Sequence, residues 1–226
     1  MAVHNGVTTN IDMFDRAQVF STTPGMNGWT IKDTSAAGAP TYLCATEDGG
    51  SAVLTLAADS EAEIVTLYHN DVLTLDVRKL DKVWFIAKVS GIDSVTTLTF
   101  GVGSAQNDTA DSVATNAWFR MQGSASTTAL LAETDDGTND LDDKATGTTL
   151  GSTYKKCLID FSQGIEDVRF YVDGVRVAGA TTFDMGDLSA GLNVQPFVQL
   201  QKASGTGTPA ITIAQFGAQY RWSYGA

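Results

Sequence analysis

Residues 165–178, IEDVRFYVDGVRVA, decide the fold. In this stretch Val168, Phe170 and Val172 alternate with other residues, which is the period of a strand with one buried face. The pair Asp173-Gly174 follows directly. An Asp-Gly pair between two alternating segments favours a two-residue hairpin turn, because both central residues need a positive φ. The stretch therefore predicts two antiparallel strands joined by a tight turn.

Alternating segments continue on both sides of this hairpin. Just upstream, Tyr154–Phe161 places Cys157, Ile159 and Phe161 on one face. Further strands are predicted over 51–56, 82–89, 96–102, 117–122, 197–202 and 211–216. Ala57–Tyr68 is compatible with a short turn of helix or with a loop that runs into a strand. The pattern predicts an all-β fold with little helix, built as a two-sheet antiparallel jelly-roll sandwich.

The composition fits such a fold and narrows the class of partner. The chain has 226 residues, of which 43% are hydrophobic and only 18% charged. A surface poor in charge suits contact with another protein, since charges are costly to desolvate. The formal net charge of −12 argues against nucleic acid and anionic membranes as partners, because both are negatively charged.

Length and termini set expectations for domain organisation. β-Sandwiches of this length commonly form one unit, so we expect a single domain over 1–226. Met1–Asn10 and Ser223–Ala226 are expected to be flexible arms that order on assembly. The start of the chain lacks the basic and apolar regions of a secretion signal, which predicts synthesis in a host cytoplasm without export by that route.

An acidic segment lies within 133–147, which is predicted to be a long loop. It contains Glu133, Asp135, Asp136, Asn139, Asp140, Asp142 and Asp143. A solvated hairpin tip is the favoured interpretation. Two alternatives stay open: contact with a basic partner surface, and a calcium site, since calcium prefers oxygen ligands. The calcium candidates are Asp135, Asp136, Asp140 and Asp142, although their spacing does not match an EF-hand loop.

Two pairs of carboxylates are candidates for a glycosidase site, because such enzymes need two converging carboxyl groups. The pairs are Asp71 with Asp76, and Asp160 with Glu166. Neither pair occupies alternate positions of one strand with aromatic residues around it. We therefore expect these side chains to serve at loop ends.

Histidine and cysteine are equally sparse. The histidines are His4 and His69, and the cysteines are Cys44 and Cys157. A zinc site needs about four converging ligands, and the chain lacks the G-x-S-x-G signature of a nucleophile elbow. The apolar neighbours of the cysteines predict buried thiols. We expect no catalytic residue, no metal and no cofactor.

The aromatic residues divide by position. Trp84 and Trp118 lie inside predicted strands, which favours core packing over a sugar-stacking face. Trp222 and Tyr224 lie near the end of the chain and are the candidates for an exposed interface anchor.

The segments Tyr154–Phe161 and Val168–Val177 resemble a strand and the following hairpin of the concanavalin A-like lectin/glucanase superfamily. Pro196–Lys202 and Ile211–Ile213 resemble its closing strands, and 12–15 with 27–29 resemble its start. The glucanase E-x-D-x-x-E strand and a lectin-like metal cluster are absent from the sequence. The resemblance therefore implies the scaffold and carries over no catalytic or metal residue.

The chain is also similar in style to jelly-roll virion proteins of tailed phages, including capsid decoration proteins. This resemblance implies a non-enzymatic structural protein of the virion that binds capsid subunits and assembles as a homo-oligomer on the particle. A carbohydrate-binding module or adhesin that recognises a surface glycan is the alternative, and a glycosidase is a third.

Overall fold

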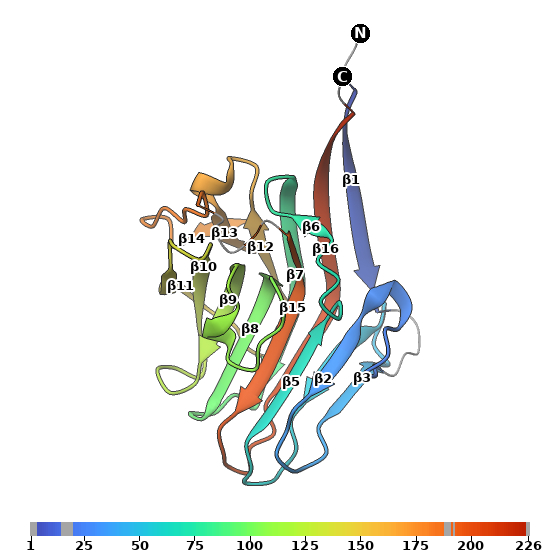
Figure 1. Ribbon diagram of the computed structural model, residues 1–226. Coiled ribbons are helices and arrows are strands. Elements are labelled where there is room, and N and C mark those ends of the chain that lie inside the picture. The colour runs from blue at the N-terminus through green and yellow to red at the C-terminus, as the bar shows by residue number, and fades with distance from the viewer. Residues whose placement is uncertain (1–3, 15–19, 188–190, 192, 225–226) are drawn as a thin grey trace.

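The computed structural model describes residues 4–14, 20–187, 191 and 193–224, which form two antiparallel β-sheets stacked face to face (Figure 1). The first sheet contains, in spatial order, β14 (Val175–Val177), β13 (Arg169–Val172), β12 (Lys155–Asp160), β7 (Leu80–Ser90), β16 (Ala210–Tyr224), β4 (Ser51–Thr55) and β3 (Thr41–Ala45), with β1 (His4–Met13) also paired to β16. The second contains β11 (Leu141–Thr149), β10 (Ala129–Asp135), β9 (Asn116–Gln122), β8 (Thr96–Gly103), β15 (Asn193–Lys202), β5 (Glu63–Tyr68) and β2 (Thr30–Asp33), with β6 (Leu75–Asp76) also paired to β15. Three short 3-10 helices occur among the described residues: η1 (Met26–Gly28), η2 (Ala110–Ser112) and η3 (Ile165–Asp167).

The predicted hairpin is confirmed as β13 and β14. Val172 pairs with Val175 across the turn, and Asp173 and Gly174 have φ of 51° and 81°. The Asp173 carboxylate also accepts a hydrogen bond from the backbone N–H of Lys156, at 2.9 Å, which ties the turn to β12. The two-sheet, nearly all-β architecture confirms the predicted fold class.

Three expectations about local structure were wrong or are now resolved. The loop expected over 133–147 is instead the end of β10, a turn, and β11. β11 is an edge strand in which every residue except Thr146 is partly or fully exposed, so it lacks the apolar alternation that marks a strand. The segment Ala57–Tyr68 contains no helix and runs through a loop into β5. Residues 4–10, expected to be a flexible arm, pair with the end of β16.

The main core fills the space between the sheets with large rings. Phe85 of the first sheet meets Phe100 of the second at 5.8 Å between ring centroids, and Phe119 of the second sheet meets Phe170 of the first at 5.2 Å. Edge-to-face contacts of this kind stabilise the fold by more than the burial of their apolar surface alone would.

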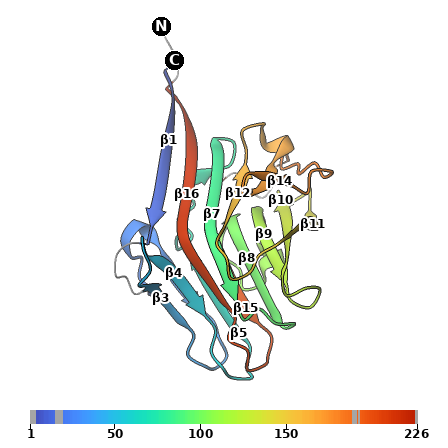
Figure 2. The ribbon, with the colours of Figure 1, turned by 180° about the vertical axis from the view of Figure 1, so that it is seen from behind.

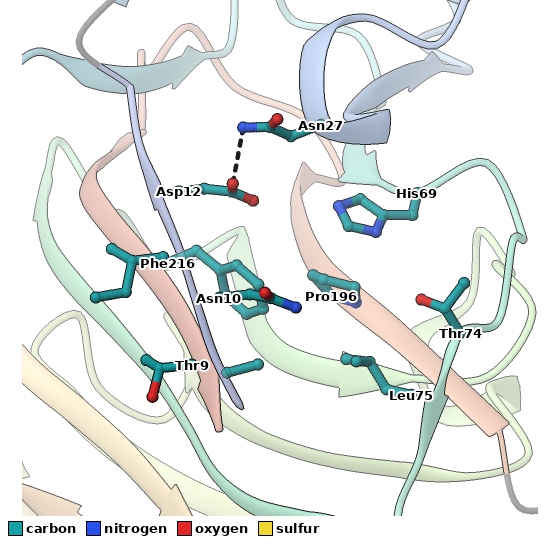
Figure 3. Close-up of a pocket in the computed structure, with 11 residues that line it drawn as sticks. Thr9, Asn10, Asp12, Asn27, His69, Thr74, Leu75, Pro196 and Phe216 are labelled. Carbon is teal, nitrogen blue, oxygen red and sulfur yellow. Dashed lines mark hydrogen bonds between the residues drawn. The ribbon is translucent and has the colours of Figure 1, made fainter. Parts of the chain in front are cut away.

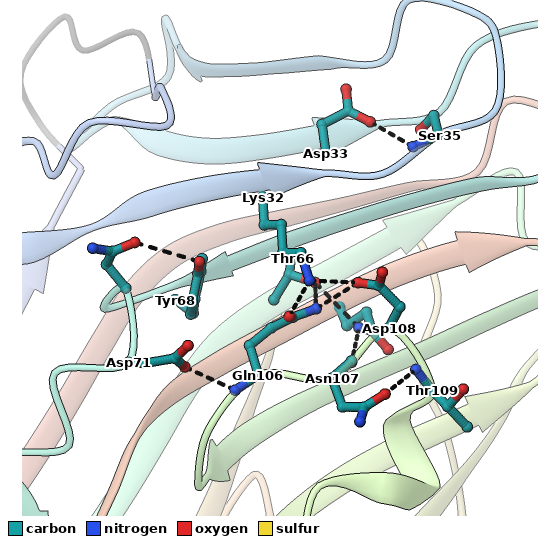
Figure 4. Close-up of polar contacts among 12 residues, drawn as sticks. Lys32, Asp33, Ser35, Thr66, Tyr68, Asp71, Gln106, Asn107, Asp108 and Thr109 are labelled. Atoms are coloured by element: carbon teal, nitrogen blue, oxygen red, sulfur yellow. Dashed lines mark hydrogen bonds and ion pairs between the residues drawn. The ribbon is translucent and has the colours of Figure 1, made fainter.

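A loop after β8 covers the other face of the second sheet. Trp118 and Phe197 point away from the main core and pack with Tyr68, Ala110 and Val113 in a small cluster of their own. Next to this cluster, Gln199 donates hydrogen bonds to the backbone oxygen of Asn107 and to the hydroxyl of Thr66. Figure 4 shows the loop residues Gln106, Asn107 and Asp108 lying over the sheet. Much of this outward face is therefore occupied by the chain itself.

A two-stranded extension leaves the sandwich at one corner. β16 pairs with β7 as far as Tyr220 opposite Leu80, whereas the pairing of β16 with β1 continues to Tyr224 opposite His4. Both views show this part projecting beyond the two sheets (Figures 1 and 2). We call β1 together with residues 215–224 of β16 the terminal ribbon.

Candidate binding cavity at the base of the terminal ribbon

A cavity of about 500 Å³ opens where the terminal ribbon joins the sandwich (Figure 3). β1 and β16 form one wall, and η1, the segment after β5, β6 and β15 form the others. The lining residues are Thr9, Asn10, Ile11, Asp12, Asn27, His69, Thr74, Leu75, Pro196, Phe216 and Ala218. The volume falls within the range of sites for small ligands, about 300–1,000 Å³.

Asp12 is the only residue of this lining that carries a charge when His69 is neutral. Its Oδ1 accepts a hydrogen bond from Asn27 Nδ2 at 2.8 Å, and its Oδ2 accepts one from Trp29 Nε1 at 3.0 Å. Burial raises the pKa of Asp12, although these two hydrogen bonds act in the opposite direction. The carboxylate is therefore held firmly in place while it stays partly desolvated.

His69 faces Asp12 and Asn27 across the cavity (Figure 3). Its ring packs edge-on against Trp29 at 4.7 Å between centroids, and its Nε2 is buried without a hydrogen-bond partner. Burial lowers the pKa of His69 to about 4, so the imidazole is neutral near pH 7. From the sequence, His69 is considered only for a zinc site and for nucleophilic catalysis, and no pattern there predicts this cavity.

The acidic segment has a different arrangement from the expected solvated tip. Glu133 is 1% exposed and Asp136 is fully buried. Arg120 of β9 reaches Glu133 at 3.1 Å and Asp111 at 2.5 Å, and its Nε lies 3.7 Å from Asp143. Burial raises the pKa of Glu133 to about 7, against the opposing effect of Arg120.

The four calcium candidates lie in or next to the turn between β10 and β11. Asp136 accepts backbone hydrogen bonds from Thr138, Asn139 and Asp187, and Asp135 accepts one from Gly137. Burial, followed by a hydrogen bond with Asp142, raises the pKa of Asp140 to about 6. Within the described ranges, no group of three or more His, Cys, Asp or Glu side chains is arranged to hold a metal ion. The calcium interpretation gains no support from this geometry.

Three of the four carboxylates in the two pairs have hydrogen-bond or ion-pair partners outside their own pair. Asp71 accepts hydrogen bonds from the backbone of Gln106 and the side chain of Gln195, and Asp76 is paired with Arg78. Asp160 accepts a bond from the backbone of Ser162. The fourth carboxylate of the two pairs, Glu166, lies in η3.

Trp84 and Trp118 are buried as expected, yet neither joins the main core. Trp118 belongs to the small cluster on the second sheet, and the Trp84 ring lies against the backbone of Gly217. Cys157 is buried, and burial raises its pKa to about 12, whereas Cys44 is only half-buried, contrary to expectation.

The candidate interface anchors belong to the terminal ribbon. The backbones of Trp222 and Tyr224 pair with Gly6 and His4 near its tip. The side chains of these residues lie outside the described part of the structure, so the anchor role stays a prediction.

No protein-family model and no curated protein sequence matches this chain. Solved structures do resemble it. The Bacteroides ovatus mixed linkage glucan GH16 enzyme has a TM-score of 0.66 at 10% identity, covering 92% of this chain and 99% of its own. An endo-1,3-β-glucanase from Streptomyces sioyaensis has a TM-score of 0.61 at 13% identity, covering 96% and 97%. The conserved carbohydrate esterase of Shiga toxin-encoding bacteriophage phi24B has a TM-score of 0.51 at 14% identity, covering 95% and 99%.

These likenesses concern the fold. They show that the chain shares the two-sheet jelly-roll fold of these proteins, which is the scaffold that the sequence resemblance implies. The structural neighbours are mostly glycoside hydrolases and carbohydrate-binding folds, and the phage protein among the three is an esterase. No helix in the described ranges is long and apolar enough to cross a membrane.

Proposed function

We propose that this chain is a non-enzymatic structural protein of a phage particle, attached to capsid subunits through its terminal ribbon. The projection of the ribbon beyond the sandwich carries the proposal. An isolated pair of strands is marginally stable in water. The distal part of the ribbon would therefore gain the most stability from contact with a partner surface.

The ribbon also has the chemistry of a contact element. Among the ten residues of β1, Asp12 is the only acidic one, and lysine and arginine are absent, in a chain of net charge −12. In the described structure β1 pairs only with β16, which leaves its other edge with backbone donors and acceptors for a partner. Many copies on one capsid would multiply weak contacts into strong attachment.

Cryo-EM of the source particle tests this proposal, with density for the sandwich expected on the capsid surface. A matched pair of substitutions tests the ribbon in co-sedimentation with particles. Ile11, in β1, is 49% exposed, and Val72, in a turn outside the ribbon, is 56% exposed. We expect Ile11→Lys to weaken attachment about tenfold and Val72→Lys to leave it unchanged. A protein found wholly separate from particles would overturn the proposal.

A second candidate is a glycan-binding module, and the cavity at the base of the ribbon favours it. Hydroxyl and amide side chains line the cavity beside a fixed carboxylate, and Phe216 supplies an aromatic wall. A glycan array tests this candidate. Binding that disappears in Asp12→Asn would favour it, and an array without any binding would count against it.

A further inference from the structure

The Asp12 carboxylate has unused acceptor capacity that matches one kind of donor. Each of its oxygens accepts one hydrogen bond, from Asn27 at 2.8 Å or Trp29 at 3.0 Å. A carboxylate offers about four acceptor positions, so one position remains on each oxygen. Two parallel N–H groups of a guanidinium fit one position on each of two carboxylate oxygens.

The charge of the cavity favours a cation. Among the described residues, no lysine or arginine forms an ion pair with Asp12, and no nearby charge affects its titration. His69 is neutral near pH 7 and so supplies no competing positive charge. A partly desolvated carboxylate without a counterion among the described side chains is costly, and a bound cation would offset that cost.

The remaining walls suit the rest of an arginine side chain. Phe216, Pro196 and Leu75 provide apolar surface for its methylene stem and for the flat face of the guanidinium. Asn10 and Thr74 also line the cavity, and they provide polar groups near the Asp12 carboxylate and the His69 imidazole (Figure 3). The volume of about 500 Å³ leaves room for the backbone that carries the side chain.

We propose that this cavity receives an arginine side chain of a partner protein, with its guanidinium paired to both oxygens of Asp12. The inference rests on the proposed attachment function, for which it names the chemistry of the partner residue. It also places the receptor site at the base of the ribbon that makes the attachment.

Binding of small probes to the full-length protein tests the proposal without particles. The probes are N-acetyl-arginine methylamide, its citrulline and lysine analogues, and methyl α-glucoside, each titrated by NMR. We expect saturable shifts for the arginine probe and at least fivefold weaker binding for the other three. The carbon resonance of the Asp12 carboxyl should titrate at lower pH when the arginine probe is bound.

Two variants and one control accompany the titration. Asp12→Asn should abolish arginine binding, whereas Asp48→Asn, the same change at an exposed position, should not. Thr74 is exposed at the rim, so Thr74→Trp should block the cavity and keep both Asp12 and the fold. Loss of binding in Thr74→Trp supports the site even where Asp12→Asn disturbs folding.

Equal binding of the arginine and citrulline probes, or arginine binding that persists in Thr74→Trp, would overturn the proposal. Equal binding of the lysine probe would overturn the guanidinium assignment, and stronger binding of the glucoside would replace it with the glycan candidate. If the arginine probe does not bind but the protein still co-sediments with particles, only this inference is overturned. Probe binding without any attachment to particles overturns the proposed function instead.

Discussion

Glu133 is an acidic residue whose burial makes stability depend on pH. Burial raises its pKa from 4.5 to about 7, and Arg120 only partly opposes this. A carboxyl whose pKa is raised on folding contributes stability that is full below pH 4.5 and is lost as the pH rises towards 7. The change corresponds to roughly 3 kcal/mol at most.

We predict that Glu133→Gln flattens this part of the pH dependence. The glutamine can still accept a hydrogen bond from Arg120, and it has no proton to lose as the pH rises. Urea unfolding from pH 4.5 to 7.5 measures the effect. Glu61→Gln makes the same change at an exposed position and should leave the slope as it is. An unchanged slope in Glu133→Gln would show that Glu133 is ionised throughout this range.

The burial of Glu133 could not be predicted from its neighbours in the sequence. It lies in a run of acids, which is typical of a solvated turn. The register of β10 places it directly opposite Trp118 of β9, on the face that η2 and its loop cover. Only pairing between strands and the position of that loop decide that Glu133 is buried and that the neighbouring Asp135 is not.

At the scale of elements, Gly101 shows how β8 and β9 come together. A side chain at Gly101 would meet the backbone oxygen of Ala117 and would lie 2.5 Å from the Cα of Trp118. Trp118 and Phe197, on the strands either side of Gly101, have ring centroids 5.6 Å apart. The glycine leaves the space that these two rings share.

We predict that Gly101→Ala lowers the free energy of unfolding by about 3 kcal/mol, because the strands would have to separate to admit one methyl group. Chemical denaturation followed by tryptophan fluorescence measures this. Gly179→Ala provides the control, since nothing lies within 4 Å of its added carbon, and should change stability by less than about 0.5 kcal/mol. Equal effects of the two substitutions would contradict this role for Gly101.

At the scale of the whole molecule, the tip of the terminal ribbon has few neighbouring strands to stabilise it. Residues 210–213 of β16 have β4 on one side and β7 on the other, whereas residues 222–224 pair, among the described strands, with β1 alone. Backbone hydrogen bonds with fewer neighbours open more readily.

We predict that amides of 4–8 and 222–224 exchange with solvent faster than those of 210–213 in the isolated protein. On particles, the ribbon amides should become protected while those of 210–213 stay as they are. Hydrogen exchange with mass spectrometry measures both states. Strong protection of the ribbon in the isolated protein would mean that it needs no partner surface to be stable.

The sequence by itself determined the fold class, through the Asp173-Gly174 turn and the alternating segments around it. Both signals are local, because a turn and a strand period are set by neighbouring residues. The tertiary structure alone decided that Asp12, Asn27, His69 and Phe216 line one cavity. These residues are brought together by pairing between β1 and β16 and by the stacking of the sheets, and no local pattern records contacts between such distant parts of the chain.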